Sequence, residues 1–204
     1  MVMIKNVVFD FGGVLIDWNP EYVFLKEFRG DRNQMNWFFE NICTSEWNEQ
    51  QDAGCNIAQA TEERVTMFPE YESLIRMYYG RWEEMLGYEI TGTIALLEKL
   101  HNKSDIALYG LTNWSHETFP IALERFDFLQ YFQDIVVSGT EKLIKPDPLI
   151  YKLLLDRNGL KAEECVFIDD KEINVLAAQK LNIFGIRFDN ANQLELELTK
   201  LGII

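Results

Sequence analysis

The chain has 204 residues, of which 48% are hydrophobic and 25% are charged, and its formal net charge is −14. This composition is typical of a globular protein with a buried core, and the length allows one domain with a large insertion or two small domains. The negative charge argues against nucleic acid or an anionic membrane as a partner.

Three scattered cysteines have neither the even number of a disulfide framework nor the spacing of a zinc site (Cys43, Cys55 and Cys165). The first residues lack the plan of a signal peptide, and no apolar run reaches the roughly 18 residues that span a bilayer. We therefore expect a cytoplasmic protein without a membrane partner. The sequence gives no indication of its oligomeric state.

The first predicted elements are a buried strand at residues 7–9 and then a series of helices up to about residue 88. Asn19, Asp31 and Thr44 or Ser45 each suit the N-terminal cap of a helix. Two further helices are expected at 56–68 and 69–86. Four of the five tryptophans lie in this helical stretch (Trp18, Trp37, Trp47 and Trp82). They suit the core of a small helical bundle, while one or two of them, such as Trp47, alternatively face a cleft and select a substrate.

From residue 91 onward, predicted helices and strands alternate. The expected strands are 106–111, 135–138, 165–168 and 184–188. The expected helices are 91–101, 115–126 with an internal proline, 147–159, one ending near 181, and one beginning near 193. Strands separated by helices indicate βαβ units, so the sequence predicts an α/β fold with a parallel sheet.

One carboxylate stands between the first strand and a pair of glycines. Asp10 follows the apolar residues 7–9 and therefore lies at a strand's carboxyl end, where ligands bind in open α/β sheets. Gly12 and Gly13 allow backbone N–H groups to approach an anion. This segment alone is also compatible with a carboxylate that merely ends a strand.

Three later segments supply further polar groups. Thr112 and Asn113 follow the strand 106–111, although Thr112 also suits the cap of the next helix. Lys145 precedes a helix opened by a proline, where exposed lysines are also common. Asp169 and Asp170 follow the strand 165–168, and adjacent carboxylates favour a bound cation, for which Mg²⁺ is suited.

In this order the four segments resemble the motifs of the haloacid dehalogenase-like hydrolase superfamily, whose members are mostly phosphatases. The resemblance covers essentially the whole chain. It implies a Rossmann-like parallel-sheet core domain at residues 1–16 and 89–204. It also implies an α-helical cap domain at residues 17–88, inserted after the first strand.

The resemblance further implies a role for each motif residue. Asp10 is the expected nucleophile, which forms an aspartyl-phosphate, and Lys145 and Thr112 complete the catalytic set. The phosphate group of a small phosphorylated substrate is expected at Phe11, Gly12, Thr112, Asn113 and Lys145. Mg²⁺ is expected at Asp10, the backbone carbonyl of Gly12, Asp169 and Asp170.

Three neighbours of these motifs are also candidates for the site. Asn174, one helical turn beyond Asp170, is expected to orient that carboxylate. Trp114 and His116 follow Thr112 closely, so they either line the cleft or pack at the start of a helix.

The chain departs from the family pattern at position 12. Phosphatases of this family usually carry a second aspartate there, which protonates the leaving group and later activates water, but Gly12 has no side chain. Loss of such a group typically lowers the rate by about 10²–10⁴. Three interpretations stay open: a Mg²⁺-dependent phosphatase, a 2-haloacid dehalogenase-type hydrolase, and a non-catalytic protein that binds a phosphorylated ligand.

Overall fold

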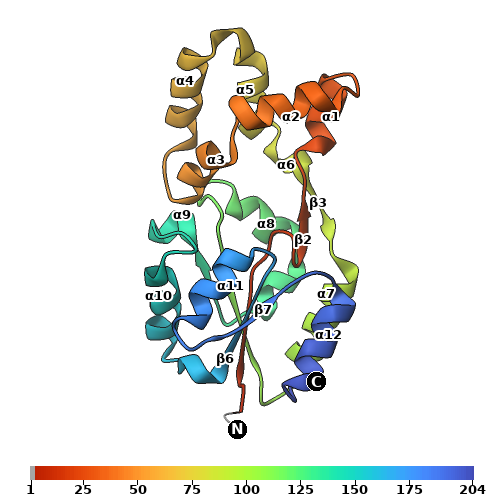
Figure 1. The fold of residues 1–204 in the computed structure, drawn as a ribbon, viewed down its shortest axis with the longest axis vertical. Coiled ribbons are helices and arrows are strands. Elements are labelled where there is room, and N and C mark those ends of the chain that lie inside the picture. Colours follow the sequence, from red (N-terminus) through yellow and green to blue (C-terminus); the bar gives the residue numbers. More distant parts are fainter. Residues whose placement is uncertain (1–2) are drawn as a thin grey trace.

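The computed structural model describes residues 3–204. A parallel sheet with flanking helices forms the lower part in Figure 1, and a group of helices forms the upper part. The sheet has five strands, in the spatial order β5 (Asp134–Val137), β4 (Ala107–Thr112), β1 (Asn6–Phe9), β6 (Cys165–Asp169) and β7 (Phe184–Arg187). Neighbouring strands are parallel throughout, so all carboxyl ends meet at one edge. Because β1 is central, the residue that follows it lies in the middle of that edge.

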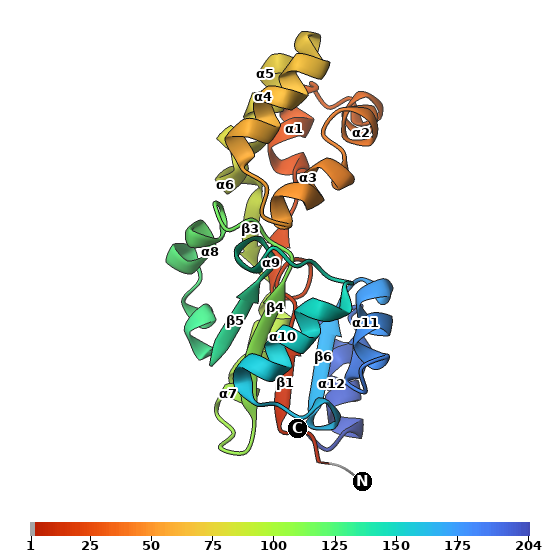
Figure 2. The same ribbon diagram turned by 90° about the vertical axis from the view of Figure 1, so that its left-hand side faces the viewer.

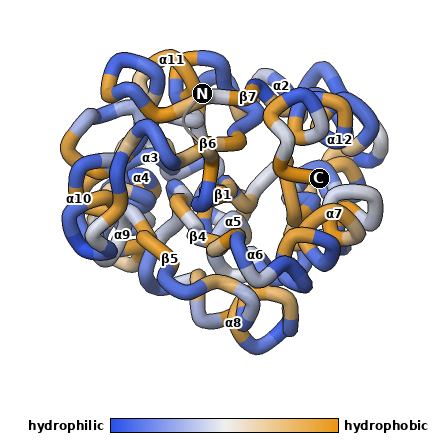
Figure 3. The backbone as a smooth tube through the Cα atoms, turned by 90° about the horizontal axis from the view of Figure 1, so that it is seen from below, coloured by the Kyte–Doolittle hydropathy of each residue, from blue (hydrophilic) through white to orange (hydrophobic). Residues whose placement is uncertain are grey.

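Helices cover both faces of the sheet, as the views in Figures 2 and 3 show. Val7 and Phe9 point to one face of the sheet, where they share an apolar cluster with residues of three helices: α7 (Thr91–His101), α8 (Phe119–Arg125) and α12 (Ala191–Lys200). Val8 points to the other, with α10 (Pro148–Asn158) and α11 (Glu172–Gln179). This alternation is the period of two that a strand buried on both faces requires. Shorter elements connect them: α9 (Ser138–Glu141) and the 3₁₀ turns Asp127–Tyr131 and Ala162–Glu164.

The upper group, called here the helical block, comprises the six helices between residues 21 and 85. They are α1 (Glu21–Glu27), α2 (Arg32–Asn41), α3 (Ser45–Asp52), α4 (Ile57–Met67), α5 (Glu72–Gly80) and α6 (Trp82–Met85), with a 3₁₀ turn at Pro69–Tyr71. Asp31, Thr44 and Asn56 accept backbone N–H groups at the starts of α2, α3 and α4, as their residue types favour. The block has an apolar cluster of its own, which includes Phe24 and Phe38.

A two-stranded antiparallel ribbon joins the helical block to the sheet. Its strands are β2 (Ile16–Trp18) and β3 (Leu86–Glu89), and Ile90 N–H donates to Leu15 O at 2.8 Å where the ribbon meets the sheet. The sequence did not predict these strands, because segments of three and four residues carry little periodicity. The boundaries expected at 16/17 and 88/89 both fall in this ribbon.

Two predicted helices differ from the structure. The helix expected at 115–126 begins only at Phe119, because Pro120 has no N–H to donate and is tolerated in the first turn but not in the interior. The helix expected at 69–86 is instead the 3₁₀ turn, α5 and α6, and its last residue already belongs to β3. Among residues 3–204, no helix has the length and apolar character to cross a membrane.

Candidate active site

The carboxyl edge of the sheet brings together residues that lie far apart in sequence. Asp10 follows β1, and its N–H donates to Ile168 O on β6 at 2.9 Å. Asp169 is the last residue of β6 and Asp170 follows it. One carboxylate oxygen from each of the three aspartates lies within 4.8 Å of the others. The sequence therefore identified the three acids that share this edge.

Lys145 is the cation that lies closest to these acids. Its Nζ is 2.9 Å from Asp10 Oδ1 and 2.7 Å from Asp169 Oδ2, and the whole residue is only 3% exposed. Asn113 fixes the loop that carries it, donating to Lys145 O at 3.0 Å and accepting from Lys145 N–H at 2.9 Å. The expected juxtaposition of Lys145 and Asp10 is present, and the Asn113 side chain has a positioning contact that the sequence did not predict.

Asn174 contacts a different aspartate from the one expected. Its Nδ2 lies 3.0 Å from both carboxylate oxygens of Asp169, so the expectation that it orients Asp170 is wrong. Asn174 lies in the first turn of α11, and its side chain points back to the strand end rather than to the following residue. Asp169 also accepts the N–H of Lys171 at 2.8 Å, which leaves this buried carboxylate firmly held.

The electrostatics of this edge favour a bound cation. Burial, opposed by Lys145 and reinforced by Asp169, raises the pKa of Asp10 to about 7, and burial together with Asp169 raises the pKa of Asp170. Lys145 pairs with Asp10 and Asp169 only, and Asp170 has no ion pair among the described residues, so negative charge is in excess. A hard divalent ion with oxygen ligands, such as Mg²⁺, suits this donor set. The residues present therefore fit the metal that the sequence implied.

Gly12 and Gly13 differ in the space around them. A Cβ at Gly12 meets no atom within 4 Å, and its φ is not left-handed. Gly13 has φ +76°, and a Cβ there would lie 3.0 Å from Asp170 Oδ2. Only Gly13 is thus required to be glycine by its conformation and by the close approach of Asp170.

Two expected phosphate-binding residues lie beneath the surface of the site. Thr112, the last residue of β4, is 1% exposed. Phe11 packs its ring in the core, and its backbone N–H donates to Asp10 Oδ1 at 2.7 Å. Contact of either residue with a phosphate group stays a prediction.

A cavity of about 510 Å³ lies between the sheet edge and the helical block. Asp10, Gly12, Asn113, Lys145 and Asp170 line its floor. Five aromatic side chains line it further out: Trp18, Phe39, Tyr78, Trp82 and Trp114.

Several expectations for the cavity wall are settled by this geometry. Trp114 lines the cavity, whereas His116 is exposed elsewhere. Trp47 packs against Tyr78 and Tyr79 in the core of the helical block, so the suggestion that it faces the cleft is wrong. The sequence did not distinguish Trp47 from Trp18 and Trp82, because a tryptophan suits the core of a small helical bundle and the wall of a cleft equally well.

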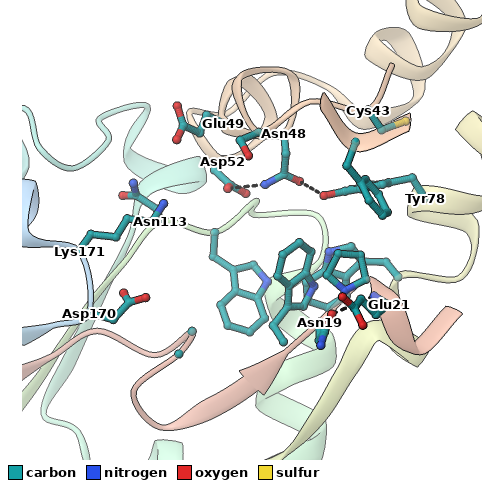
Figure 4. Close-up of a pocket in the computed structure, with 18 of the residues that line it drawn as sticks. Asn19, Glu21, Cys43, Asn48, Glu49, Asp52, Tyr78, Asn113, Asp170 and Lys171 are labelled. Atoms are coloured by element: carbon teal, nitrogen blue, oxygen red, sulfur yellow. Dashed lines mark hydrogen bonds between the residues drawn. The ribbon is translucent and has the colours of Figure 1, made fainter. Parts of the chain in front are cut away.

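Polar residues of the helical block form the roof above the acids, and the sequence did not identify them. Asn48, Glu49 and Asp52 project from α3, and Figure 4 shows Asp52 above Asp170, with Asn113 and Lys171 beside it. Asn48 Nδ2 donates to Asp52 Oδ2 at 2.9 Å. No motif surrounds these residues, so no local signal pointed to them.

The model of the haloacid dehalogenase-like hydrolase family matches residues 7–187, which include the four strand-end segments. The chain belongs to the haloacid dehalogenase-like hydrolase family. The predicted family, α/β fold class and hydrolase class are therefore confirmed.

Relatives of this hydrolase include named phosphatases. It is 27% identical to a sesquiterpene phosphatase of Aspergillus oryzae, over 97% of this chain and 96% of that protein. It is 24% identical to a phosphoglycolate phosphatase of Vibrio cholerae, over 91% and 84% of the two chains. Among solved structures, a magnesium complex of a family enzyme from Bacteroides thetaiotaomicron aligns with TM-score 0.72 and 27% identity, covering 92% of this chain and 94% of that one.

Proposed function

We propose that this hydrolase is a Mg²⁺-dependent phosphatase that cleaves a small phosphorylated metabolite through an aspartyl-phosphate intermediate. The observation that carries the proposal is the cluster of Asp10, Asp169 and Asp170 at the cavity floor, in which Lys145 pairs with Asp10 and Asp169. The names of the two phosphatase relatives and the magnesium complex of the structural neighbour support the same reading.

In this proposal each floor residue has a separate task. Asp10 attacks phosphorus with a carboxylate oxygen while the bond from phosphorus to the leaving oxygen breaks, and water then cleaves the aspartyl-phosphate. Lys145 holds the attacking carboxylate in place and supplies positive charge to the phosphate oxygens. The Thr112 hydroxyl and the backbone N–H groups of Gly12 and Asn113 are the proposed donors to those oxygens, because the N–H of Phe11 donates to Asp10 Oδ1 and that of Gly13 to Ile16 O.

Asp10, Asp169, Asp170 and the carbonyl of Gly12 are the groups that would hold Mg²⁺. The ion, when bound, supplies charge that offsets repulsion between these carboxylates and a phosphate dianion. Asn174 and Lys171 N–H keep Asp169 oriented, and such outer contacts typically change metal affinity or activity about 10–100-fold. We also propose that the helical block, within residues 17–88, acts as the cap over a core formed by 1–16 and 89–204. A cytoplasmic location stays a prediction.

The outer part of the cavity favours a substrate whose organic group has an apolar face. Trp18, Trp82 and Trp114 provide flat apolar surface there. Phosphoglycolate, whose organic group has two carbons and a carboxylate, would leave this wall uncovered and add negative charge near the acids.

A screen of phosphorylated metabolites, with Mg²⁺ and with chelator, tests the proposal. We expect phosphate release only with Mg²⁺, its loss in Asp170→Ala, and faster turnover of 3-phenylpropyl phosphate than of phosphoglycolate. Chelator-insensitive halide release from a 2-haloacid, with no ester hydrolysed, would favour the dehalogenase. Tight phosphometabolite binding without turnover would favour the non-catalytic binder.

A further inference from the structure

Without an acid at position 12, the leaving oxygen needs a proton donor from elsewhere around the cavity. Among the described residues that line it, three carboxyl side chains come from the helical block: Glu21, Glu49 and Asp52. Glu21 pairs with Arg32, and Glu49 is exposed. Asp52 is partly buried, accepts a hydrogen bond from the neutral amide of Asn48 and has no ion pair among the described residues, and it lies above Asp170 in Figure 4.

Asp52 is attached to the sheet edge although it belongs to the helical block. It is the last residue of α3, and its backbone carbonyl accepts from the buried hydroxyl of Ser138 at 2.5 Å. Ser138 directly follows β5 and also accepts the N–H of Trp114 at 2.9 Å. The Ser115 backbone also interacts with the Asp52 carboxylate. These contacts fix Asp52 relative to the ends of β4 and β5, and β4 delivers Thr112 and Asn113.

A hydrogen-bonded chain orients the carboxyl group. Tyr78 and Tyr79 donate to Asn48 Oδ1 at 3.3 and 3.0 Å. This fixes the amide so that its Nδ2 faces Asp52 Oδ2. The amide nitrogen can donate but not accept, so the proton of a neutral Asp52 must reside on the other oxygen. That oxygen is Asp52 Oδ1, which has no hydrogen bond to Asn48.

The charges around Asp52 suit a group that both gives and takes a proton. Burial raises the pKa of Asp52 to about 7, with a further increase from Glu49, while the Ser115 backbone, Lys171 and Asn48 lower it. Tyr78 and Tyr79 also face it, and their own pKa values are raised, so they stay neutral. Both forms of the carboxyl group are thus populated near neutral pH, where a general acid and base works best.

We propose that Asp52, reaching in from the helical block, is the general acid and base that the sheet edge lacks at position 12. The inference rests on the proposed phosphatase function. As Asp10 attacks phosphorus and the ester bond breaks, the proton of Asp52 passes to the leaving oxygen, which departs as an alcohol. Asp52 then accepts a proton from the water that attacks the aspartyl-phosphate. Phosphate is released, Asp10 regains its carboxylate, and Asp52 is protonated again.

The test compares two esters in the full-length protein with Mg²⁺. 3-Phenylpropyl phosphate has a poor leaving group that needs a proton, whereas p-nitrophenyl phosphate does not. In Asp52→Asn we expect kcat for the alkyl ester to fall about 10²–10⁴-fold and kcat for the aryl ester to change little. Glu46→Gln, which removes an exposed charge from the same helix, is the matched control and should leave both rates unchanged.

The pH profile separates proton donation from a structural role. The acid functions only while protonated, so alkyl-ester turnover should fall as pH rises through about 7, and Asp52→Asn should lack this descending limb. Asn48→Ala removes a contact that lowers the pKa of Asp52, so the limb should move to higher pH. This second variant tests the assignment even if Asp52→Asn fails to fold.

Equal losses on both esters, or a descending limb that persists in Asp52→Asn and stays in place in Asn48→Ala, would overturn the role of Asp52. Such a result leaves the wild-type phosphatase activity intact. Absence of Mg²⁺-dependent phosphate release from any ester by the wild-type protein would instead contradict the proposed function itself.

Discussion

The floor of the cavity holds its polar side chains by buried ion pairs, whereas the roof holds them by hydrogen bonds among neutral groups. On the floor, Lys145 lies within 3 Å of two buried carboxylates. In the roof, two tyrosines hold Asn48, which holds Asp52. Breaking a buried ion pair typically costs about 3–5 kcal/mol, and a neutral hydrogen bond contributes about 1 kcal/mol. The floor is therefore the rigid part of the site, and the roof is the part that adapts with little loss of stability.

The largest expected effect comes from the floor. Asp10→Asn keeps the side-chain shape but removes the nucleophile, so phosphate release should fall to below about 1% of wild type while the protein stays folded. Asp105→Asn, in the exposed loop before β4, is the matched control and should retain full activity. Activity of more than a few per cent in purified Asp10→Asn would contradict the nucleophile assignment.

A new acid on the floor should replace the one in the roof. Gly12→Asp introduces a carboxyl group where a Cβ meets no neighbour and φ causes no strain. In an Asp52→Asn background we expect it to restore alkyl-ester turnover by up to about 10²–10⁴, equivalent to roughly 3–5 kcal/mol of barrier, with less gain on the aryl ester. Repulsion from the floor acids opposes the gain.

The control for this exchange is the neighbouring glycine. Gly13→Asp should give no gain and should destabilise the protein, because φ is +76° and Asp170 lies against the new Cβ. If Gly12→Asp folds and binds Mg²⁺ but gives no preferential gain on the alkyl ester, proton donation does not limit turnover.

Removing the floor cation should lower stability more than removing any surface cation. Lys145→Met leaves Asp10 and Asp169 buried without their partner, which should lower the free energy of unfolding by about 3–5 kcal/mol in chelator. The loss should be smaller at pH 5 than at pH 8, because burial raises the pKa of Asp10 to about 7 and acid therefore neutralises that carboxyl group. Urea unfolding of both proteins at pH 5 and at pH 8 measures the loss in the free energy of unfolding. Lys99→Met, at an exposed pair with Glu195, is the control and should cost about 1 kcal/mol or less.

The smallest expected effect lies on the outer surface of the helical block. Arg76 on α5 pairs with Glu62 on α4 and with Glu72, and all three side chains are exposed. Arg76→Ala should lower the free energy of unfolding by less than about 1 kcal/mol and leave turnover unchanged. Thermal unfolding in low and high salt measures this, and a loss comparable to that of Lys145→Met would show that exposed charges contribute as much as the floor ion pairs.

The same contrast explains what the sequence revealed. The floor acids each follow a buried apolar run within a few positions, so the strand pattern alone predicts that Asp10, Asp169 and Asp170 share one edge of the sheet. The roof residues come from α3, which no buried strand precedes, and only the folding of the ribbon brings them over the acids. No local pattern encodes that approach.

Individual misassignments have equally local causes. Asn174 follows Asp170 by one helical turn, yet α11 begins at Glu172 and turns the amide back to Asp169. The ribbon was missed because its strands are too short for periodicity to show. The prediction of a helix at 115–126 placed Pro120 in the helix interior, although a proline in the first turn marks the start of a helix.

The ribbon has a consequence for how this molecule can be remodelled. The chain leaves the sheet at Leu15 and returns at Ile90, and these two residues are already hydrogen-bonded to each other. The free energy of closing a loop changes by only about 0.6 kcal/mol for each doubling of its length. The helical block is therefore an interchangeable part: a tight turn or a foreign helical segment grafted between β2 and β3 would meet the same pair of anchor points. The catalytic strands would keep their register, while the size of admissible substrates would be set by whatever is grafted.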